Sequence, residues 1–225
     1  MTATISALKL AVTNAFKAEG LDIRLMKGSE PNSDGDLYEL FVLTEAVVAL
    51  RAVHGPGHVV VEPSGPTYRI SGSPSPEWYG LSWFRVAPKD VVLRTGVEID
   101  CRDGARCEVD LAVVGHAAAA AAAAARGRSV QSAAVQAGLE CKNHKDPPSR
   151  TIAQGATMTA IRLRVSAFSP SVMRKVPFAL VSPLSVTADA ATVLRAFDCD
   201  AVDCAHPGLG SLGAARLQAW ITSSV

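Results

Sequence analysis

The sequence predicts an α/β protein in which helices flank a mixed central sheet, and three observations carry this prediction. Apolar residues recur at helical spacing in residues 1–16 and 37–53, period-two runs fill residues 90–114, and strand and helix patterns alternate over residues 134–197. The chain has 225 residues, of which 48% are hydrophobic and 19% charged. It is therefore long and apolar enough to bury a substantial core, which excludes a disordered or collagen-like protein.

The first part of the chain predicts two helices and then several short strands. The first helix, residues 1–16, lacks the basic start, long apolar block and cleavage site of a secretory signal. A break rich in Gly, Ser, Pro, Asn and Asp at residues 28–36 separates it from a second helix at 37–53. The β-type runs that follow, which are expected to form an insertion or sheet extension, cover residues 58–61, 67–70 and 81–86.

Two longer strands, residues 90–101 and 107–114, form the predicted centre of the sheet. The turn between them, Arg102-Asp-Gly-Ala-Arg, contains an Asp-Gly hairpin signal. Simple alternation along the second strand predicts one side for Cys107, Val109, Leu111 and Val113, and the other side for Glu108 and Asp110.

The rest of the chain predicts further strands and the helices that cover them. Nine alanines at 117–125 predict a helical or mobile connection with no chemistry of its own. Strands are expected at 134–142 and 177–186, and helices at 149–165, 188–197 and 212–221. We expect a single domain with an N-terminal helix and loop (1–36), a core (37–186) and a C-terminal extension (187–225).

Side chains suited to phosphodiester hydrolysis lie on two of the central strands. Glu140 and Lys142 are two residues apart and so share a face, and Asp110 joins them if the two strands are neighbours. Carboxylates hold Mg²⁺ through hard oxygen ligands, and the metal activates water. A lysine at such a site orients the water or stabilises developing negative charge.

This pattern, Asp110 followed by Glu140-Cys141-Lys142 in hydrophobic strands, resembles the PD-(D/E)xK nuclease superfamily, which includes Mrr-type nucleases and archaeal Holliday-junction resolvases. The resemblance runs from about residue 37 to about residue 186. It implies a restriction-endonuclease-like core with a β-rich insertion before the core meander. It also implies that Asp110 and Glu140 are metal ligands, that Cys141 lends its backbone carbonyl, and that Lys142 is the catalytic lysine.

The same resemblance extends to two residues on the flanking helices and to the cofactor. Glu39 is similar to a glutamate that many members carry on the helix before the meander, and Gln154 to a glutamine on the helix after the lysine strand. The tyrosine that often follows that glutamine by one turn is Met158 here. The implied cofactor is Mg²⁺, for which Mn²⁺ can substitute.

The distribution of charge favours DNA as the partner. The whole chain carries a formal charge of +1, but residues 126–175 contain nine Lys and Arg against two acidic residues, a balance of +7. A concentration of positive charge beside the expected site suits contacts with the phosphate backbone. We expect Arg126, Arg128, Lys145 and Arg150 to make these contacts, and Arg162 and Arg164 to face solvent.

These observations predict an Mg²⁺-dependent endodeoxyribonuclease of the restriction, defence or repair type. The alternative is a nuclease-like module that has lost activity and binds nucleic acid or a partner protein. Cutting both strands with one site per chain predicts a homodimer, unless the chain nicks one strand or is a subunit of a larger defence complex. A small-molecule α/β enzyme has no support from a GxGxxG, Walker or GxSxG motif.

Cysteine and apolar content bear on the compartment. Five cysteines without a tight CxxC pair favour reduced thiols in a cytoplasmic protein. Cys199, Cys204 and His206 match no standard zinc template. No stretch has the roughly 20 strongly apolar residues of a spanning helix, so no membrane association is expected.

Overall fold

The computed structural model describes residues 5–25, 34–63, 67–70, 78, 81–164, 175–207 and 212–225. The helices are α1 (Ile5–Ala18), α2 (Asp34–His54), α3 (His116–Ala124), α4 (Arg150–Arg164), α5 (Ala188–Ala196) and α6 (Leu212–Ser224). The strands are β1 (Asp22–Leu25), β2 (Val59–Glu62), β3 (Thr67–Ile70), β4 (Trp83–Val86), β5 (Val91–Asp100), β6 (Arg106–Gly115), β7 (Ser129–Gln131), β8 (Val135–Cys141), β9 (Phe178–Val181) and β10 (Asp200–Val202). Short 3-10 helices cover Ala87–Lys89 and Ser132–Ala134.

Within these residues, eight strands form one mixed sheet, which confirms the predicted α/β architecture. The order is β10-β9-β8-β6-β5-β4-β2, and β7 pairs with β5 outside this path. The strands β8, β9 and β10 run parallel, whereas β8, β6, β5, β4 and β2 are antiparallel neighbours. β1 and β3 pair separately in a two-stranded parallel sheet.

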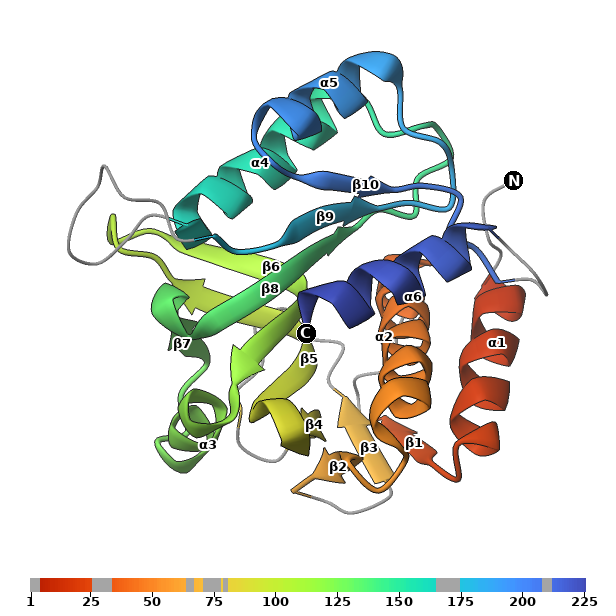
Figure 1. Ribbon diagram of the computed structural model, residues 1–225, viewed down its shortest axis with the longest axis vertical. Helices are drawn as coiled ribbons and strands as arrows, with labels where there is room; N and C mark the ends of the chain where they lie inside the picture. The colour runs from red at the N-terminus through yellow and green to blue at the C-terminus, as the bar shows by residue number, and fades with distance from the viewer. Residues whose placement is uncertain are drawn as a thin grey trace.

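Helices cover both faces of the sheet (Figure 1), and the sheet separates the core into two clusters. The first cluster packs α1, α2 and α6 against Leu93, Leu111 and Leu139 of the sheet. The second packs α4 and α5 against Phe178 and Leu180. No helix in the described part of the chain is long and apolar enough to cross a membrane.

The elements with a long sequence period lie close to their predicted positions. This holds for α1, α2, the β5–β6 hairpin, β8, α4, α5 and α6, and the alanine tract forms the helix α3. The strand predicted at 177–186 ends earlier, at Val181, because the chain bends at Pro183 and Leu184. β2, β3 and β4 lie within or beside the short runs predicted at 58–61, 67–70 and 81–86, whereas β1, β7 and β10, of three or four residues, were not predicted.

The predicted alternation along residues 107–113 is wrong. Cys107 and Val109 pack with the cluster under α4 and α5. Leu111 and Val113, which simple alternation would place beside them, pack with the cluster under α1, α2 and α6. The strand β6 therefore changes face between Val109 and Leu111.

A glycine on the neighbouring strand accounts for this change of face. On β5, Leu93 packs in the first cluster and Val97 in the second, so both strands of the hairpin change face at the same level. Gly96 lies between these residues and has a φ of 59°, and the ladder skips Gly96 on β5 and Asp110 on β6, between the pairs Thr95–Leu111 and Val97–Val109. Glycine adopts this left-handed conformation without a steric cost, and it reverses the alternation locally. Asp110 therefore lies at the level where both strands of the hairpin change face.

Candidate functional site

Asp110, Glu140 and Lys142 meet where β6 and β8 stop pairing. The two strands are antiparallel neighbours, and Leu111 lies opposite Leu139 at the last pair of the ladder. Lys142 Nζ lies 2.7 Å from Glu140 Oε1 and 3.4 Å from Asp110 Oδ2. The structure thus brings together the two carboxylates and the ammonium that the sequence pattern singled out.

Backbone contacts fix the position of this group. The N–H of Cys141 donates to Asp110 Oδ2 at 2.7 Å, so a carboxylate replaces the next rung of the ladder. The N–H of Lys142 donates to the carbonyl of Val181 on β9 at 2.9 Å. The Cys141 side chain is buried in the cluster under α2. The strand end that carries Glu140 and Lys142 is therefore held from both sides.

The three side chains are recessed but accessible, and their charges are strongly coupled. Asp110 exposes 15% of its side chain, Glu140 17% and Lys142 28%. Burial raises the pKa of Glu140, with a further rise from Asp110 and an opposing effect from Lys142. Burial alone would lower the pKa of Lys142, but Asp110 and Glu140 raise it above its ordinary value. Lys142 is therefore an ammonium at neutral pH.

Glu39 of α2 lies in the electrostatic field of the same group. Burial and the charges of Asp110, Asp36 and Glu108 together raise the pKa of Glu39 to about 9, against the opposing effect of Lys142. At neutral pH Glu39 is therefore protonated unless more positive charge is present. The helix α2 thus contributes a carboxyl group to the neighbourhood of Asp110.

Two acidic residues of this neighbourhood were not singled out as site residues from the sequence. Glu108 and Asp36 both contribute to the raised pKa of Glu39. Glu108 precedes Asp110 by two residues and Asp36 precedes Glu39 by three. Residues two apart on a strand share a face, which pairs Glu108 with Asp110, and residues three or four apart on a helix share a face, which pairs Asp36 with Glu39.

This donor set fits a hard divalent cation. Glu39, Glu108, Asp110 and Glu140 bring four carboxyl groups to this neighbourhood, and burial followed by their mutual repulsion raises the pKa of Glu39 and Glu140. Oxygen ligands of this kind suit Mg²⁺ and Mn²⁺. Among the described residues, no three His, Cys, Asp or Glu side chains already surround a point that could hold an ion. To hold a cation, Asp110 and Glu140 would have to exchange part of their contact with Lys142 for it.

Gln154 is not drawn into this group. It lies on α4, its side chain is exposed, and within the described residues it makes no hydrogen bond to Asp110, Glu140 or Lys142. Met158, one turn further along α4, is 52% exposed. The helix α4 covers the face of the sheet opposite to α2.

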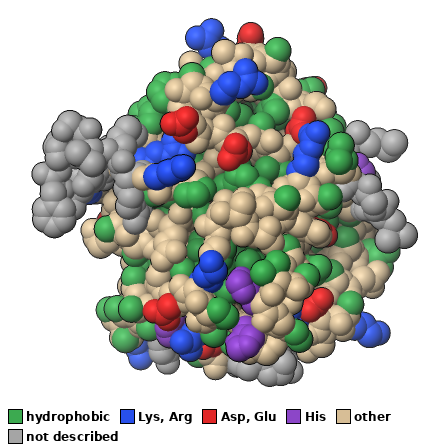
Figure 2. Space-filling view, viewed as in Figure 1, with side chains coloured by type: hydrophobic (Ala, Val, Ile, Leu, Met, Phe, Trp, Pro, Cys, Tyr) green, Lys and Arg blue, Asp and Glu red, His purple; other side chains and the backbone are tan. Residues whose placement is uncertain are grey.

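The four basic residues expected to contact DNA are all exposed, but they form two pairs. Arg126 and Arg128 lie between α3 and β7, in the segment that leads to the start of β8. Lys145 and Arg150 follow the end of β8, where Lys142 lies. The face in Figure 2 carries Lys and Arg side chains with acidic ones between them, so it is not a continuous basic surface.

The expectation that Arg164 faces solvent is wrong. It is 8% exposed, and its guanidinium donates to the carbonyls of Val176, Phe197 and Asp198. Arg162, by contrast, is partly exposed and pairs with Asp103 at 3.5 Å. Buried carbonyl groups need donors, and Arg164 supplies three of them, so this cation serves the fold and is not available to a phosphate.

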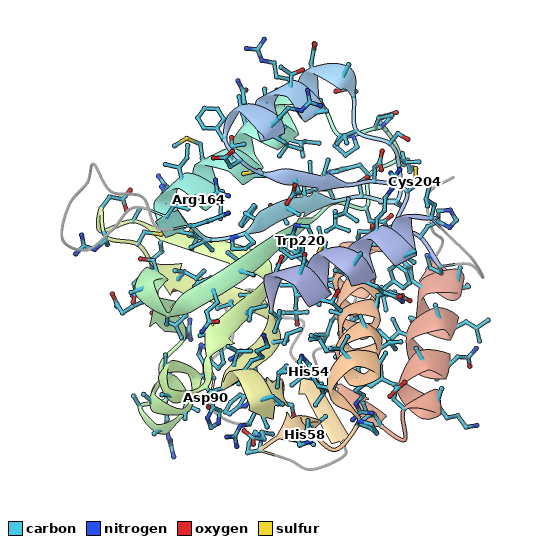
Figure 3. All side chains as sticks on the ribbon, viewed as in Figure 1. His54, His58, Asp90, Arg164, Cys204 and Trp220 are labelled. Carbon is cyan, nitrogen blue, oxygen red and sulfur yellow. The ribbon has the colours of Figure 1, made fainter. Side chains whose placement is uncertain are left out.

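The cysteine and histidine residues near the C-terminal part do not converge on one point. Cys199 donates to the carbonyl of Phe197, Cys204 contacts Ser185 Oγ at 3.3 Å, and His206 Nδ1 contacts the carbonyl of Pro207. In Figure 3, Cys204 lies beside the first turn of α6, at the right of the view, and Arg164 lies at the left. The contacts of these residues are local.

A cavity of about 630 Å³ lies away from the carboxylate group, between α4, α5, β10 and α6. Its lining includes Arg164, Lys175, Asp198, Asp200 and Trp220, and Figure 3 places Arg164 and Trp220 on different helices around it. The indole N–H of Trp220 donates to Asp200 Oδ2 at 2.7 Å. No sequence pattern predicted this cavity, because its walls come from four separate elements.

No protein-family model matches the chain, and no curated protein matches its sequence.

Proposed function

We propose that the protein is a divalent-metal-dependent nuclease that hydrolyses phosphodiester bonds of DNA on a restriction-endonuclease-like core. One observation carries this proposal: Lys142 Nζ contacts Glu140 Oε1 at 2.7 Å and Asp110 Oδ2 at 3.4 Å, from two neighbouring strands. The same residues carry the resemblance to the PD-(D/E)xK superfamily. Glu39, on the helix before the meander, adds support because its pKa responds to Asp110.

Each residue of the group has a role that follows from its charge state. Lys142 is protonated at neutral pH, so it acts as a cation that orients water and stabilises negative charge on the phosphate, and not as a general base. Asp110 and Glu140 would hold the metal ion, which when bound offsets phosphate charge and activates water. Glu39 keeps a proton at neutral pH in the metal-free protein, and a bound cation would lower its pKa and favour the carboxylate, which would then add to the negative charge that holds the metal.

The exposed pair Lys145 and Arg150 follows the strand of Lys142, and these two residues would contact the phosphate backbone nearest the site. Arg126 and Arg128 would contact the backbone further along the duplex. Cutting both strands would then require two copies of the chain or its assembly in a larger complex. The five cysteines are free thiols, which supports the expectation of a cytoplasmic protein.

Incubation with DNA tests this proposal. Linear, circular and single-stranded DNA are incubated with the protein in Mg²⁺, Mn²⁺ or Ca²⁺. We expect cleavage with Mg²⁺ or Mn²⁺ and binding without efficient turnover in Ca²⁺, because the looser coordination of Ca²⁺ positions water poorly. No cleavage of any substrate with either metal would contradict the proposal.

A second function is favoured by the same contacts that carry the first. Because Lys142 already pairs with both carboxylates, the site is also compatible with a nuclease-like module that binds nucleic acid or a partner protein without catalysis. Calorimetric titration with Mg²⁺ or Mn²⁺ separates the two. A nuclease takes up the metal and loses this uptake in Glu140→Gln, whereas an inactive module takes up none.

A further inference from the structure

Two cysteine thiols face each other across the turn of the β5–β6 hairpin. Cys107 lies opposite Ile99 in the ladder, and Cys101 follows Ile99 by two residues, so the two thiols share one face. The N–H of Cys101 donates to the carbonyl of Ala105 at 2.8 Å, which closes the turn. The two Sγ atoms lie 3.1 Å apart.

The surroundings of the pair hold the two sulfurs in place and leave one of them accessible. Cys101 is 6% exposed, whereas Cys107 is half-buried. Both pack against the core cluster under α4 and α5. In the turn between the two cysteines, Asp103 pairs with Arg162 of α4 at 3.5 Å, so the hairpin end is tied to the helix that covers the pair.

We propose that Cys101 and Cys107 form a redox-active dithiol, which a low-molecular-weight disulfide such as glutathione disulfide oxidises to an intramolecular disulfide. This inference is independent of the proposed nuclease activity. Formation of the bond brings the Sγ atoms from 3.1 Å to about 2.05 Å. The hairpin thus needs to move its sulfurs by about one ångström.

The reaction proceeds by two exchanges. The Cys107 thiolate attacks one sulfur of the small disulfide, the S–S bond breaks, and one thiolate leaves and takes up a proton. The Cys101 thiolate then attacks Cys107 Sγ and displaces the second thiolate, which is also protonated. Two electrons pass from the protein thiols to the small disulfide, and the products are one protein disulfide and two small thiols.

The environment of Cys107 sets the rate of the first exchange. Burial raises the pKa of Cys107, and the hydrogen bond and charge of Cys101 raise it further, while Arg162 opposes and Asp103 adds to the rise. The attacking thiolate is therefore scarce at neutral pH, and oxidation is slow there. Below the pKa, its fraction and hence the rate rise about tenfold per pH unit.

The disulfide closes a ring that ends three residues before Asp110. Residues 101–107 form this ring, and Glu108 and Asp110 follow directly on β6. Oxidation therefore constrains the strand β6, which carries Asp110, close to the level where the hairpin changes face at Gly96.

Thiol counting after exposure of the folded, full-length protein to glutathione disulfide tests the proposal. Remaining thiols are alkylated and counted by mass spectrometry, and disulfides are mapped on peptides. We expect the five free cysteines to fall by two, with one disulfide joining Cys101 and Cys107 and no retained glutathione. Cys199→Ser, which changes another buried thiol that donates to a carbonyl, should oxidise in the same way.

Cys101→Ser removes the second exchange and should stop at one glutathione on Cys107. The urea-unfolded chain serves as the control that the reagent is active. If the unfolded chain oxidises while all five thiols of the folded protein stay free at every pH tested, the proposal is overturned. A disulfide that maps to any other pair in the folded protein overturns it as well.

Discussion

The backbone N–H of Cys141 donates to Asp110 Oδ2 at 2.7 Å, and Cys141 is the residue between Glu140 and Lys142. The carboxylate of Asp110 therefore fixes the strand end that carries both of those side chains. This single contact joins the two strands of the candidate site beyond the end of their ladder. A change at Asp110 therefore affects both the charge of the site and the alignment of the strands. Two substitutions at this position separate these effects.

Asp110→Ala and Asp110→Asn both remove the charge, but the asparagine oxygen still accepts the N–H of Cys141. An unsatisfied, partly buried donor costs about 1–3 kcal/mol. We therefore expect the alanine variant to have a free energy of unfolding lower than that of the asparagine variant by about this amount, measured in urea. Equal stabilities would mean that the Cys141 contact contributes nothing to the fold.

The raised pKa of Glu39 predicts a pH dependence of stability in the metal-free protein. Because this pKa is about 9 in the fold and 4.5 for an ordinary glutamate side chain, the folded state binds more protons between these values. Stability should therefore fall as the pH rises through this window, by up to about 1.4 kcal/mol per pH unit. Unfolding in EDTA at several pH values measures this slope.

Glu39→Gln provides the control for this slope. The amide does not titrate, so the variant should lose the part of the decline that Glu39 causes, keep the smaller part that the raised pKa of Glu140 causes, and be more stable than the unchanged protein at mildly alkaline pH. An unchanged slope of stability against pH in Glu39→Gln would contradict the prediction, because it would mean that Glu39 does not titrate in this window.

Two helical glycines differ in what an added methyl group would meet. At Gly213, the first turn of α6, a Cβ would lie 2.1 Å from the carbonyl carbon of Cys204, whereas at Gly155 of α4 it would meet nothing within 4 Å. Gly213→Ala must displace α6, which packs on α2, and should cost about 1–3 kcal/mol or more. Gly155→Ala should stabilise α4 by about 0.5–1 kcal/mol. Thermal unfolding of both variants measures the contrast. An unchanged stability of Gly213→Ala would contradict the close packing of α6 against Cys204.

Long periodic elements were predictable because many side chains repeat the same pattern. The hairpin and the helix α2 each span ten or more residues, so their period survives local exceptions. The proximity of Asp110, Glu140 and Lys142 followed from strand order and a period of two.

What the sequence did not predict depends on single residues and on contacts between distant elements. The change of face on β6 depends on one positive φ at Gly96, which no periodicity reveals. Arg164 looked like a surface cation because its three carbonyl partners lie 12 to 34 residues away. Gln154 was assigned by resemblance alone, and the exposed face of α4 does not bring it to Asp110.

The exposed pair after β8 should carry part of the affinity for DNA. Lys145→Glu with Arg150→Glu is expected to weaken binding across sequences, since each neutralised phosphate releases counterions, and to reduce the slope of log K against log salt by about one unit per lost contact. Surface substitutions of this kind cost little stability. Fluorescence anisotropy at several salt concentrations measures both quantities. Unchanged affinity and slope would show that this pair is a solvated surface.

The most direct test of the nuclease proposal compares Lys142→Ala with Lys89→Ala in DNA cleavage with Mg²⁺. Lys89 is an exposed lysine at the end of the Ala87–Lys89 3-10 helix, so it controls for the loss of one positive charge. Far-ultraviolet circular dichroism and DNA binding confirm that both variants are folded. We predict that Lys89→Ala cleaves as the unchanged protein does and that Lys142→Ala loses on the order of a hundredfold or more in rate, because the ammonium stabilises charge in the transition state. Cleavage by Lys142→Ala at the unchanged rate would contradict the proposal.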